Sequence, residues 1–208
     1  MTQFGLFTAP LSLIAGGRGE VTYHAGFLPA VFSDAVFATL RDGVDWHANR
    51  RVMYEREVDV PRLTAHFPLE RLRSGEAEGI STDAASMLCE AAARVTDALR
   101  APFNSIGLNF YRDGSDSVAP HNDRLQDLVK GEPIALLSLG GTRRMLIRSK
   151  KPGEPAVPID LEAGSLLVMS WASQLHYTHG VAKTRAAVEP RISVALRVRP
   201  RDSARRSS

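Results

Sequence analysis

His121 and Asp123 are the residues of this sequence whose type and spacing most directly indicate metal binding. In an extended segment, residues two apart point to the same face, so the imidazole and the carboxylate can converge on one ion. A second histidine from elsewhere would complete a set of two histidines and one carboxylate, which binds non-haem Fe(II) and leaves coordination positions open. The His-X-Asp pattern is short and common by chance, so the prediction depends on what accompanies it.

The segment 191–199 is a second candidate, because its sequence RISVALRVR alternates between apolar and polar residues. The alternation predicts a strand with one apolar core face and with Arg191, Ser193, Arg197 and Arg199 on the other face. These arginines could lie on a solvent-exposed face, as on many half-buried strands. They would also suit a dicarboxylate ligand, because the planar guanidinium group pairs with a carboxylate through two parallel hydrogen bonds.

The segment 105–111 (SIGLNFY) has the same alternating character. Leu108 and Phe110 share one face of the predicted strand, while Asn109 and Tyr111 share the other. An amide and a phenol side by side can complete the hydrogen bonding of a bound carboxylate. An ordinary exposed strand face is the alternative interpretation of this pair.

Two segments before residue 104 have the spacing of amphipathic helices and would support these strands. Residues 27–42 place apolar groups on one side, with Ser33 as a candidate N-cap. Residues 82–100 show the clearer apolar stripe, and either Ser81 or Thr82 can cap its start.

After residue 104, short runs rich in β-branched residues are separated by Gly, Pro and Asp. These runs lie at 105–111, 134–139, 143–148, 157–161, 165–170 and 191–199. The pattern predicts a β-sandwich or barrel, and helices followed by such a core make an α+β fold. The intervening residues 44–79 lack clear periodicity and predict a loop-rich cover over one face of the core.

The bulk composition indicates one globular domain that is not a membrane protein. The chain has 208 residues, 44% of them hydrophobic and 24% charged, and no apolar run approaches the length of about 20 residues that spans a bilayer. The single cysteine, Cys89, excludes an intramolecular disulfide, and we expect a cytoplasmic monomer. The net charge of +3, the pI of about 9.3 and a flexible basic tail at 200–208 permit a nucleic-acid partner without requiring one.

Taken together and in this order, the motifs resemble those of the AlkB family of Fe(II)- and 2-oxoglutarate-dependent dioxygenases. The resemblance runs through LNFYRDGSDSVAPHND, IALLSLGGTRRMLI, GSLLVMS, HYTHGV and PRISVALR, within residues 108–197. Upstream, MYEREVDVPRLTAHF at 53–67 is similar to the family's substrate-covering segment. The resemblance implies a single domain, 1–208, with helices and the covering segment in 1–104 and a double-stranded β-helix (jelly-roll) core in 105–199.

The resemblance also implies which residues hold the iron and the co-substrate. The implied Fe(II) ligands are His121, Asp123 and His179. His176 is a rival for the third position, but His179 begins the His-Gly-Val run that matches the family's ligand. The residues implied to hold 2-oxoglutarate are Asn109, Tyr111, Arg191, Ser193 and Arg197. Ser193 departs from the asparagine that family members often carry there.

The activity implied by the resemblance is oxidative demethylation of N-alkylated bases in DNA, with RNA as a further candidate. The reaction would consume O2 and 2-oxoglutarate and release formaldehyde, succinate and CO2. Single strands should be preferred, because an enzyme that acts on a base needs that base unpaired. The residues implied to contact the substrate are Met53, Tyr54, Arg62, His66 and Phe67.

Arg124 and Leu125 mark the departure that bears on the substrate. Family members that demethylate nucleic acids often carry acidic residues after the His-X-Asp motif, where this chain has Arg124 and Leu125. The same oxidation chemistry on a protein side chain or a small molecule is therefore the alternative function.

Overall fold

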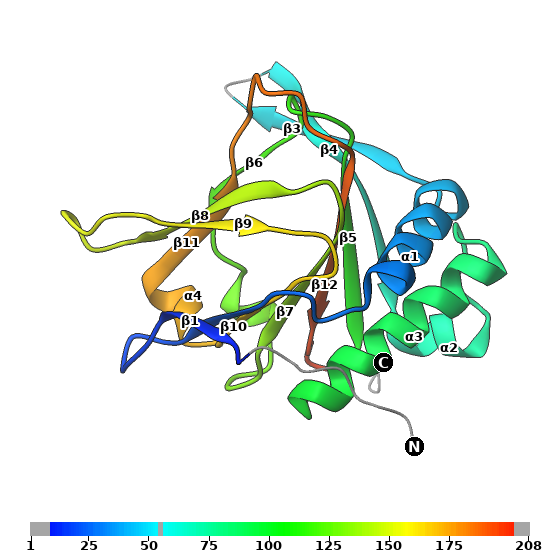
Figure 1. Ribbon diagram of the computed structural model, residues 1–208, viewed down its shortest axis with the longest axis horizontal. Helices are drawn as coiled ribbons and strands as arrows, with labels where there is room; N and C mark the ends of the chain where they lie inside the picture. Colours follow the sequence, from blue (N-terminus) through cyan, green and yellow to red (C-terminus); the bar gives the residue numbers. More distant parts are fainter. Residues whose placement is uncertain (1–8, 54–55, 202–208) are drawn as a thin grey trace, which may run out of the picture.

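The β core consists of two antiparallel sheets that pack face to face (Figure 1), as seen in a computed structural model that describes residues 9–53 and 56–201. The larger sheet has the strand order β1 (Leu11–Ile14), β2 (Val21–His24), β10 (Leu166–Met169), β7 (Ile134–Gly140), β12 (Arg191–Arg197), β5 (Ser105–Tyr111), β4 (Arg56–Pro68) and β3 (His47–Met53). The smaller sheet has the order β6 (Val118–His121), β11 (Tyr177–Val181), β8 (Arg143–Ser149) and β9 (Val157–Leu161). The predicted α+β jelly-roll fold is confirmed.

The helices lie on the outer face of the larger sheet, at the right of Figure 1. They are α1 (Ala30–Gly43), α2 (Leu69–Ser74) and α3 (Thr82–Leu99), while the short α4 (Ser173–His176) and the 3-10 turn η1 (Leu125–Asp127) belong to the loops of the β core. None of the helices in the described part of the chain is long and apolar enough to cross a membrane.

β12 separates the two hydrophobic cores of the molecule. Ile192, Val194 and Leu196 face the helices and are fully buried, as the alternation in the sequence predicts. Ala195 points into the second core, between the two sheets. The polar face of β12 therefore looks inward, toward the smaller sheet, and the alternative that it meets solvent is wrong for Arg191, which is 1% exposed.

The predicted helix starts need one correction. Ser81 caps α3 as expected, because its side chain accepts a hydrogen bond from the backbone N–H of Ala84. Ser33 does not cap α1, which begins at Ala30 after Pro29. Ser33 instead lies inside the helix, where its hydroxyl is buried. Proline before the first turn gives the helix its start without a side-chain cap.

The predicted loop-rich cover at 44–79 is wrong over most of its length, because β3, β4 and α2 occupy it. β4 pairs with β5 from Leu63 to Pro68, so it extends the larger sheet beyond β5. The β3–β4 register shifts between Ala48 and Arg50. Such an irregularity breaks the alternation by which a strand is recognised in a sequence.

Candidate functional site

A cavity of about 1040 Å³ lies between the two sheets. Strands β4, β5 and β12 of the larger sheet line one side, and β6 and β11 of the smaller sheet line the other. Most of the predicted metal, co-substrate and substrate residues lie in this cavity: His121, Asp123, His179, Asn109, Tyr111, Arg191, Ser193, Arg197, Arg62 and His66.

His121 and His179 form an adjacent imidazole pair at the smaller-sheet side of the cavity. β6 and β11 place them directly opposite each other, with ring centroids 4.5 Å apart. His121 Nδ1 lies 2.9 Å from the carbonyl oxygen of Ala119, and since a carbonyl only accepts, Nδ1 is the donor of this hydrogen bond and Nε2 is the nitrogen left for a metal. Burial and the neighbouring His121 lower the pKa of His179 to about 3, so its ring is neutral at physiological pH. The His179 ring is therefore in the state that binds metals.

His176 lies on α4 and does not line the cavity. The geometry thus favours His179 as the third candidate ligand, because only His179 stands in register with His121.

Asp123 shares the cavity with the two histidines but is paired with Arg197. Arg197 Nε donates to Asp123 Oδ2 at 2.7 Å, and Arg197 Nη2 donates to Oδ1 at 3.1 Å. Burial alone would raise the pKa of the Asp123 carboxyl, but the charge and hydrogen bonds of Arg197 hold it below its usual value. Asp123 is accordingly a carboxylate across the neutral pH range.

As they stand, no three His, Cys, Asp or Glu side chains among the described residues converge closely enough to hold a metal ion. The donor set nevertheless fits Fe(II), since it combines two imidazoles and one ionised carboxylate on the wall of one cavity. Binding would require Asp123 to share its carboxylate between Arg197 and the metal.

Arg191, at the start of β12, is a buried cation whose hydrogen bonds are incomplete. One guanidinium nitrogen, Nη2, donates to Ser138 Oγ at 2.8 Å. The other two, Nε and Nη1, are buried and lack a hydrogen-bond partner among the described residues. Burial lowers the pKa of the Arg191 guanidinium group, because its charged form is less stable away from water. An anionic ligand such as a carboxylate would satisfy both orphaned nitrogens.

Of the other predicted co-substrate residues, Tyr111 contacts Arg191, Asn109 and Ser193 lie further along the same strands, and Arg197 lies at the far end of β12, where it pairs with Asp123. Tyr111 is 4% exposed, and the Arg191 guanidinium carbon lies 5.3 Å from its ring centroid. Ser193 and Asn109 are directly paired across β12 and β5 and line the same cavity. Asn109 Oδ1 also accepts a hydrogen bond of 2.7 Å from Arg62 Nε, which connects the predicted co-substrate and substrate residues.

Ser138 and Arg143 are site residues that the sequence reasoning missed. A serine within the otherwise apolar run IALLSLG was the available signal for Ser138, because a hydroxyl in a fully buried strand needs a partner. Arg143 is 3% exposed and had no comparable signal, since its partners are backbone carbonyls.

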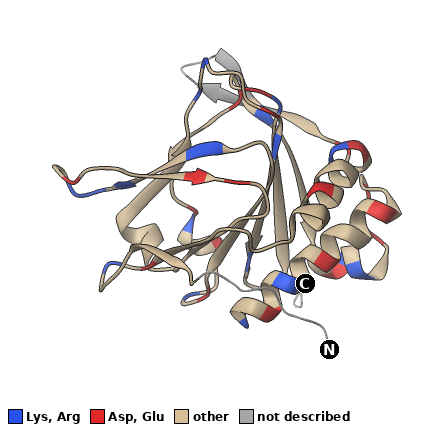
Figure 2. Cartoon of the chain, viewed as in Figure 1, with Lys and Arg blue, Asp and Glu red and all other residues tan. Residues whose placement is uncertain are grey.

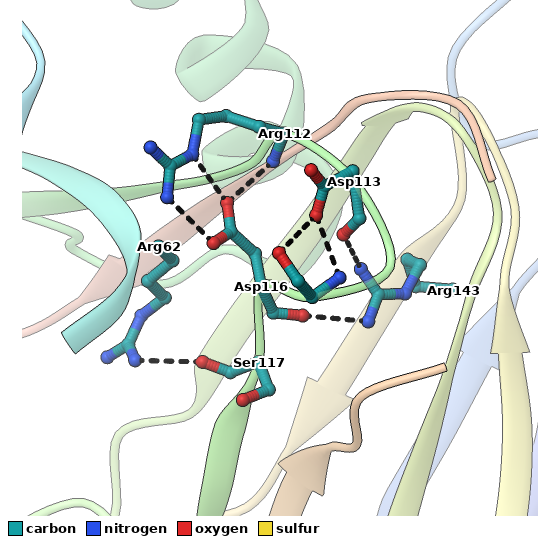
Figure 3. A network of polar contacts seen from close by, with 7 residues as sticks. Arg62, Arg112, Asp113, Asp116, Ser117 and Arg143 are labelled. Atoms are coloured by element: carbon teal, nitrogen blue, oxygen red, sulfur yellow. Dashed lines mark hydrogen bonds and ion pairs between the residues drawn. The ribbon is translucent and has the colours of Figure 1, made fainter. Parts of the chain in front are cut away.

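Arg143 joins the two chain segments on either side of the histidine pair. Its guanidinium group donates to the carbonyl oxygens of Asp113 and Asp116, before β6, and of Ala182, directly after β11. Figure 3 shows the contacts of Arg143 with Asp113 and Asp116. It also shows the ion pair of Arg112 and Asp116, in which the nitrogen–oxygen distance is 2.8 Å. The network fixes the start of β6 and hence the position of His121.

The predicted substrate residues lie partly at the mouth of the cavity. Arg62 and His66 line it, and His66 Nε2 shares a hydrogen bond of 2.9 Å with Ser105 Oγ. Phe67 is 5% exposed and packs in the core beneath the helices, because successive residues of β4 point to opposite faces. Phe67 therefore does not reach the cavity, and its predicted contact with the substrate is wrong. Tyr54 lies outside the described residues, as does the side chain of Met53.

The sequence is similar to a known protein family and to individual dioxygenases. The 2OG-Fe(II) oxygenase superfamily profile matches residues 20–201. Alpha-ketoglutarate-dependent dioxygenase alkB homolog 3 of Mus musculus is 30% identical over 196 residues, which cover 90% of this chain and 68% of that protein. DNA oxidative demethylase ALKBH2 of Mus musculus is 31% identical over 111 residues, covering 50% of this chain and 46% of that protein.

Solved structures show the same fold at lower sequence identity. The structure of OsALKBH1 matches with a TM-score of 0.54 at 17% identity, covering 88% of this chain and 99% of that chain. A Pseudomonas putida prolyl-4-hydroxylase matches with a TM-score of 0.53 at 18% identity, covering 86% of this chain and 93% of that chain. The profile match extends over most of the sequence, and the family implies Fe(II) and 2-oxoglutarate. The chain belongs to the 2OG-Fe(II) oxygenase superfamily and is an Fe(II)- and 2-oxoglutarate-dependent dioxygenase.

Proposed function

We propose that this dioxygenase demethylates N-alkylated bases in DNA, with His121, Asp123 and His179 as its iron ligands. The observation that carries the site assignment is the presence, in one cavity, of an adjacent histidine pair and a buried guanidinium group with two nitrogens that lack a partner among the described residues. The first suits a metal and the second suits a dicarboxylate. When bound, iron and 2-oxoglutarate would supply an oxidant for C–H hydroxylation, with succinate and CO2 as products.

The chain's own residues bind and orient the reactants. Arg191 would hold a carboxylate of 2-oxoglutarate through Nε and Nη1, supported by Tyr111 and Ser138. Arg197 would keep the Asp123 carboxylate ionised and oriented. The two sheets bury this end of the cavity, which limits the access of water to the reacting atoms.

A nucleic-acid substrate is supported by the charge around the cavity and by the relatives. Arg62, Arg124 and Arg199 line the cavity in addition to the two arginines of the co-substrate region. Positively charged side chains around a cleft attract a phosphate backbone without reading its sequence. One relative is named DNA oxidative demethylase ALKBH2, which supports an alkylated DNA base as the substrate of this protein.

The test is formaldehyde and succinate release by the purified protein, loaded with Fe(II), on matched oligonucleotides. The panel contains N-methylated single-stranded DNA, the same lesion in a duplex, the same lesion in RNA, and unmethylated DNA. We expect both products from methylated DNA, faster on the single strand because no base pair must open. Succinate without formaldehyde on every oligonucleotide would move the proposal to a protein or small-molecule substrate.

A further inference from the structure

Gln174 is a fully buried amide that contacts the chain beside the proposed iron ligands. It is 1% exposed and lies on α4, the helix that directly precedes the strand carrying His179. Its side-chain Oε1 accepts a hydrogen bond of 2.9 Å from the backbone N–H of Asp123. Its Nε2 donates to Ser173 Oγ at 3.1 Å, so both ends of the amide are used.

Asp123 needs such a contact because it lies beyond the end of β6. Pairing between β6 and β11 sets His121 opposite His179, but it ends at His121. The Asp123 side chain, in turn, is paired with Arg197 on β12 of the larger sheet. The bond to Gln174 therefore ties the Asp123 backbone to the histidine side of the cavity while its carboxylate is drawn to the opposite side.

The support beneath Gln174 is itself fixed. Lys150 Nζ donates to the carbonyl oxygen of Gln174 at 2.9 Å, and the Lys150 backbone N–H donates to that of His176 at 2.8 Å. Ser173 Oγ donates to the carbonyl oxygen of Ser170 at 2.7 Å. α4 is thus anchored to the end of β8 on one side and to the end of β10 on the other. A rigid support lets one side chain set a distance between two segments.

We infer that Gln174 is a positioning residue for metal binding, which fixes the Asp123 backbone relative to His179. The inference rests on the proposed assignment of His121, Asp123 and His179 as iron ligands. Residues that hold a ligand in place without touching the metal typically change metal affinity by about 10- to 100-fold when they are replaced. Gln174 would change the metal affinity by a similar factor, through its contact with Asp123.

The experiment titrates the metal-free protein with Co(II), followed by the visible absorption of the bound ion, without 2-oxoglutarate. Gln174→Met keeps the length of the side chain and removes the acceptor for the Asp123 N–H group. We expect Gln174→Met to bind Co(II) about 10- to 100-fold more weakly and to alter the Co(II) spectrum. Gln174→Glu keeps an oxygen acceptor at the same place and should recover most of the affinity.

Val95→Ala is the matched control for stability, because Val95 is fully buried in α3, on the helical side of the larger sheet. It should lower the melting temperature without changing the Co(II) affinity. Co(II) affinity within threefold of the parent in Gln174→Met would overturn the inference, provided that Asp123→Ala loses binding. Undiminished affinity in Asp123→Ala would instead overturn the proposed ligand set.

Discussion

Arg143 and Arg191 are two buried arginines beside the ring of Tyr111 that differ in how their charges are satisfied. Their guanidinium carbons lie 5.7 Å and 5.3 Å from the ring centroid. Arg143 donates to three backbone carbonyl oxygens. Arg191 donates to Ser138, and its Nε and Nη1 lack a hydrogen-bond partner among the described residues. A buried cation without partners lowers the stability of the free protein. If Arg191 binds the co-substrate as proposed, its unpaired nitrogens serve binding at some cost to the stability of the ligand-free fold.

The first prediction compares the two arginines by their effect on the free energy of unfolding. Arg191→Met should raise the free energy of unfolding of the ligand-free protein by about 1 kcal/mol or more, because an uncompensated charge is removed. Arg143→Met should lower it by about 2 kcal/mol or more, because three carbonyl groups lose their donor. Urea denaturation of both variants measures the difference. Equal destabilisation of the two would contradict it.

The second prediction concerns the co-substrate. Loss of a charge-assisted partner costs about 1.5–3 kcal/mol, so Arg191→Met should raise the 2-oxoglutarate concentration for half-maximal succinate formation roughly 10- to 100-fold. 2-Oxoglutarate should also raise the melting temperature of the parent but not that of the variant. Ser138→Ala, which removes a neutral partner of Arg191, should have a smaller effect in the same direction. Unchanged dependence in Arg191→Met would mean that another residue holds the co-substrate.

The third prediction concerns the metal ligands. His179→Ala should abolish high-affinity Fe(II) binding, because one of the paired imidazoles is lost. His176→Ala should retain it, because His176 lies outside the cavity. Metal content after equilibrium dialysis, measured on both variants, distinguishes them. The reverse result would assign the third position to His176.

For individual residues, the sequence predicted which side chains could take part in chemistry but not which residues they contact. The spacing of His121 and Asp123 predicted that both side chains reach one cavity, as they do, whereas their role as metal ligands stays a prediction. The Arg197–Asp123 pair and the Gln174–Asp123 bond could not be predicted, since both join residues that are far apart in the chain. Phe67 was misplaced because the alternation within β4 was not recognised.

Strands were predictable where alternation was unbroken. β12 kept its register with β5 and β7 over its whole length, and its apolar and polar faces were predicted correctly. β6 and β11, which hold the histidines, were not identified as strands. They are short, and the β6–β11 register shifts between His179 and Val181. The two strands that hold the histidines were therefore not predicted from the sequence.

The fourth prediction concerns the loop that leads into β6 and its response to acid. Burial alone would raise the pKa of the Asp116 carboxyl, but hydrogen bonds and charge from Arg112 lower it below its usual value. A lowered pKa in the folded state gives stability that is present above about pH 4 and lost as the pH falls further. Asp116→Asn should therefore lose stability at pH 6 and lose less at pH 3, as measured by urea denaturation.

Asp160→Asn is the control for this loop. Asp160 also pairs with an arginine, Arg144, but both side chains are largely exposed, and such pairs contribute little to stability. The variant should match the parent at both pH values. The same pH response in Asp116→Asn as in the parent would show that the Arg112–Asp116 pair does not stabilise the loop.

Charge is distributed unevenly over the whole molecule. Figure 2 shows acidic and basic residues together on the helices at the right of the view, where α1, α2 and α3 carry six acidic and four basic residues. Five arginines and two aspartates line the cavity. An anionic polymer would therefore be repelled by the helical layer and attracted to the cavity. The asymmetry would orient a nucleic acid before any base is recognised.

The fifth prediction uses this asymmetry. Arg124 is exposed and lines the cavity, so Arg124→Ala should reduce the slope of log binding constant against log salt concentration by about 0.7 for single-stranded DNA. Arg94, on the helical layer, pairs with Glu90, and Arg94→Ala should leave the slope unchanged. Fluorescence anisotropy at several salt concentrations measures both. Equal slopes in all three proteins would place the nucleic acid elsewhere.

β12 is the last of the described strands to be synthesised, yet it lies between β7 and β5 in the interior of the larger sheet. Until it inserts, a nascent chain would expose two unpaired strand edges to neighbouring molecules. Insertion requires contacts between residues far apart in the chain, which slows folding. Because the same strand carries Arg191 and Arg197, ligand binding and the completed sheet should appear in one cooperative step. 2-Oxoglutarate added during refolding would then stabilise the finished protein without accelerating its formation.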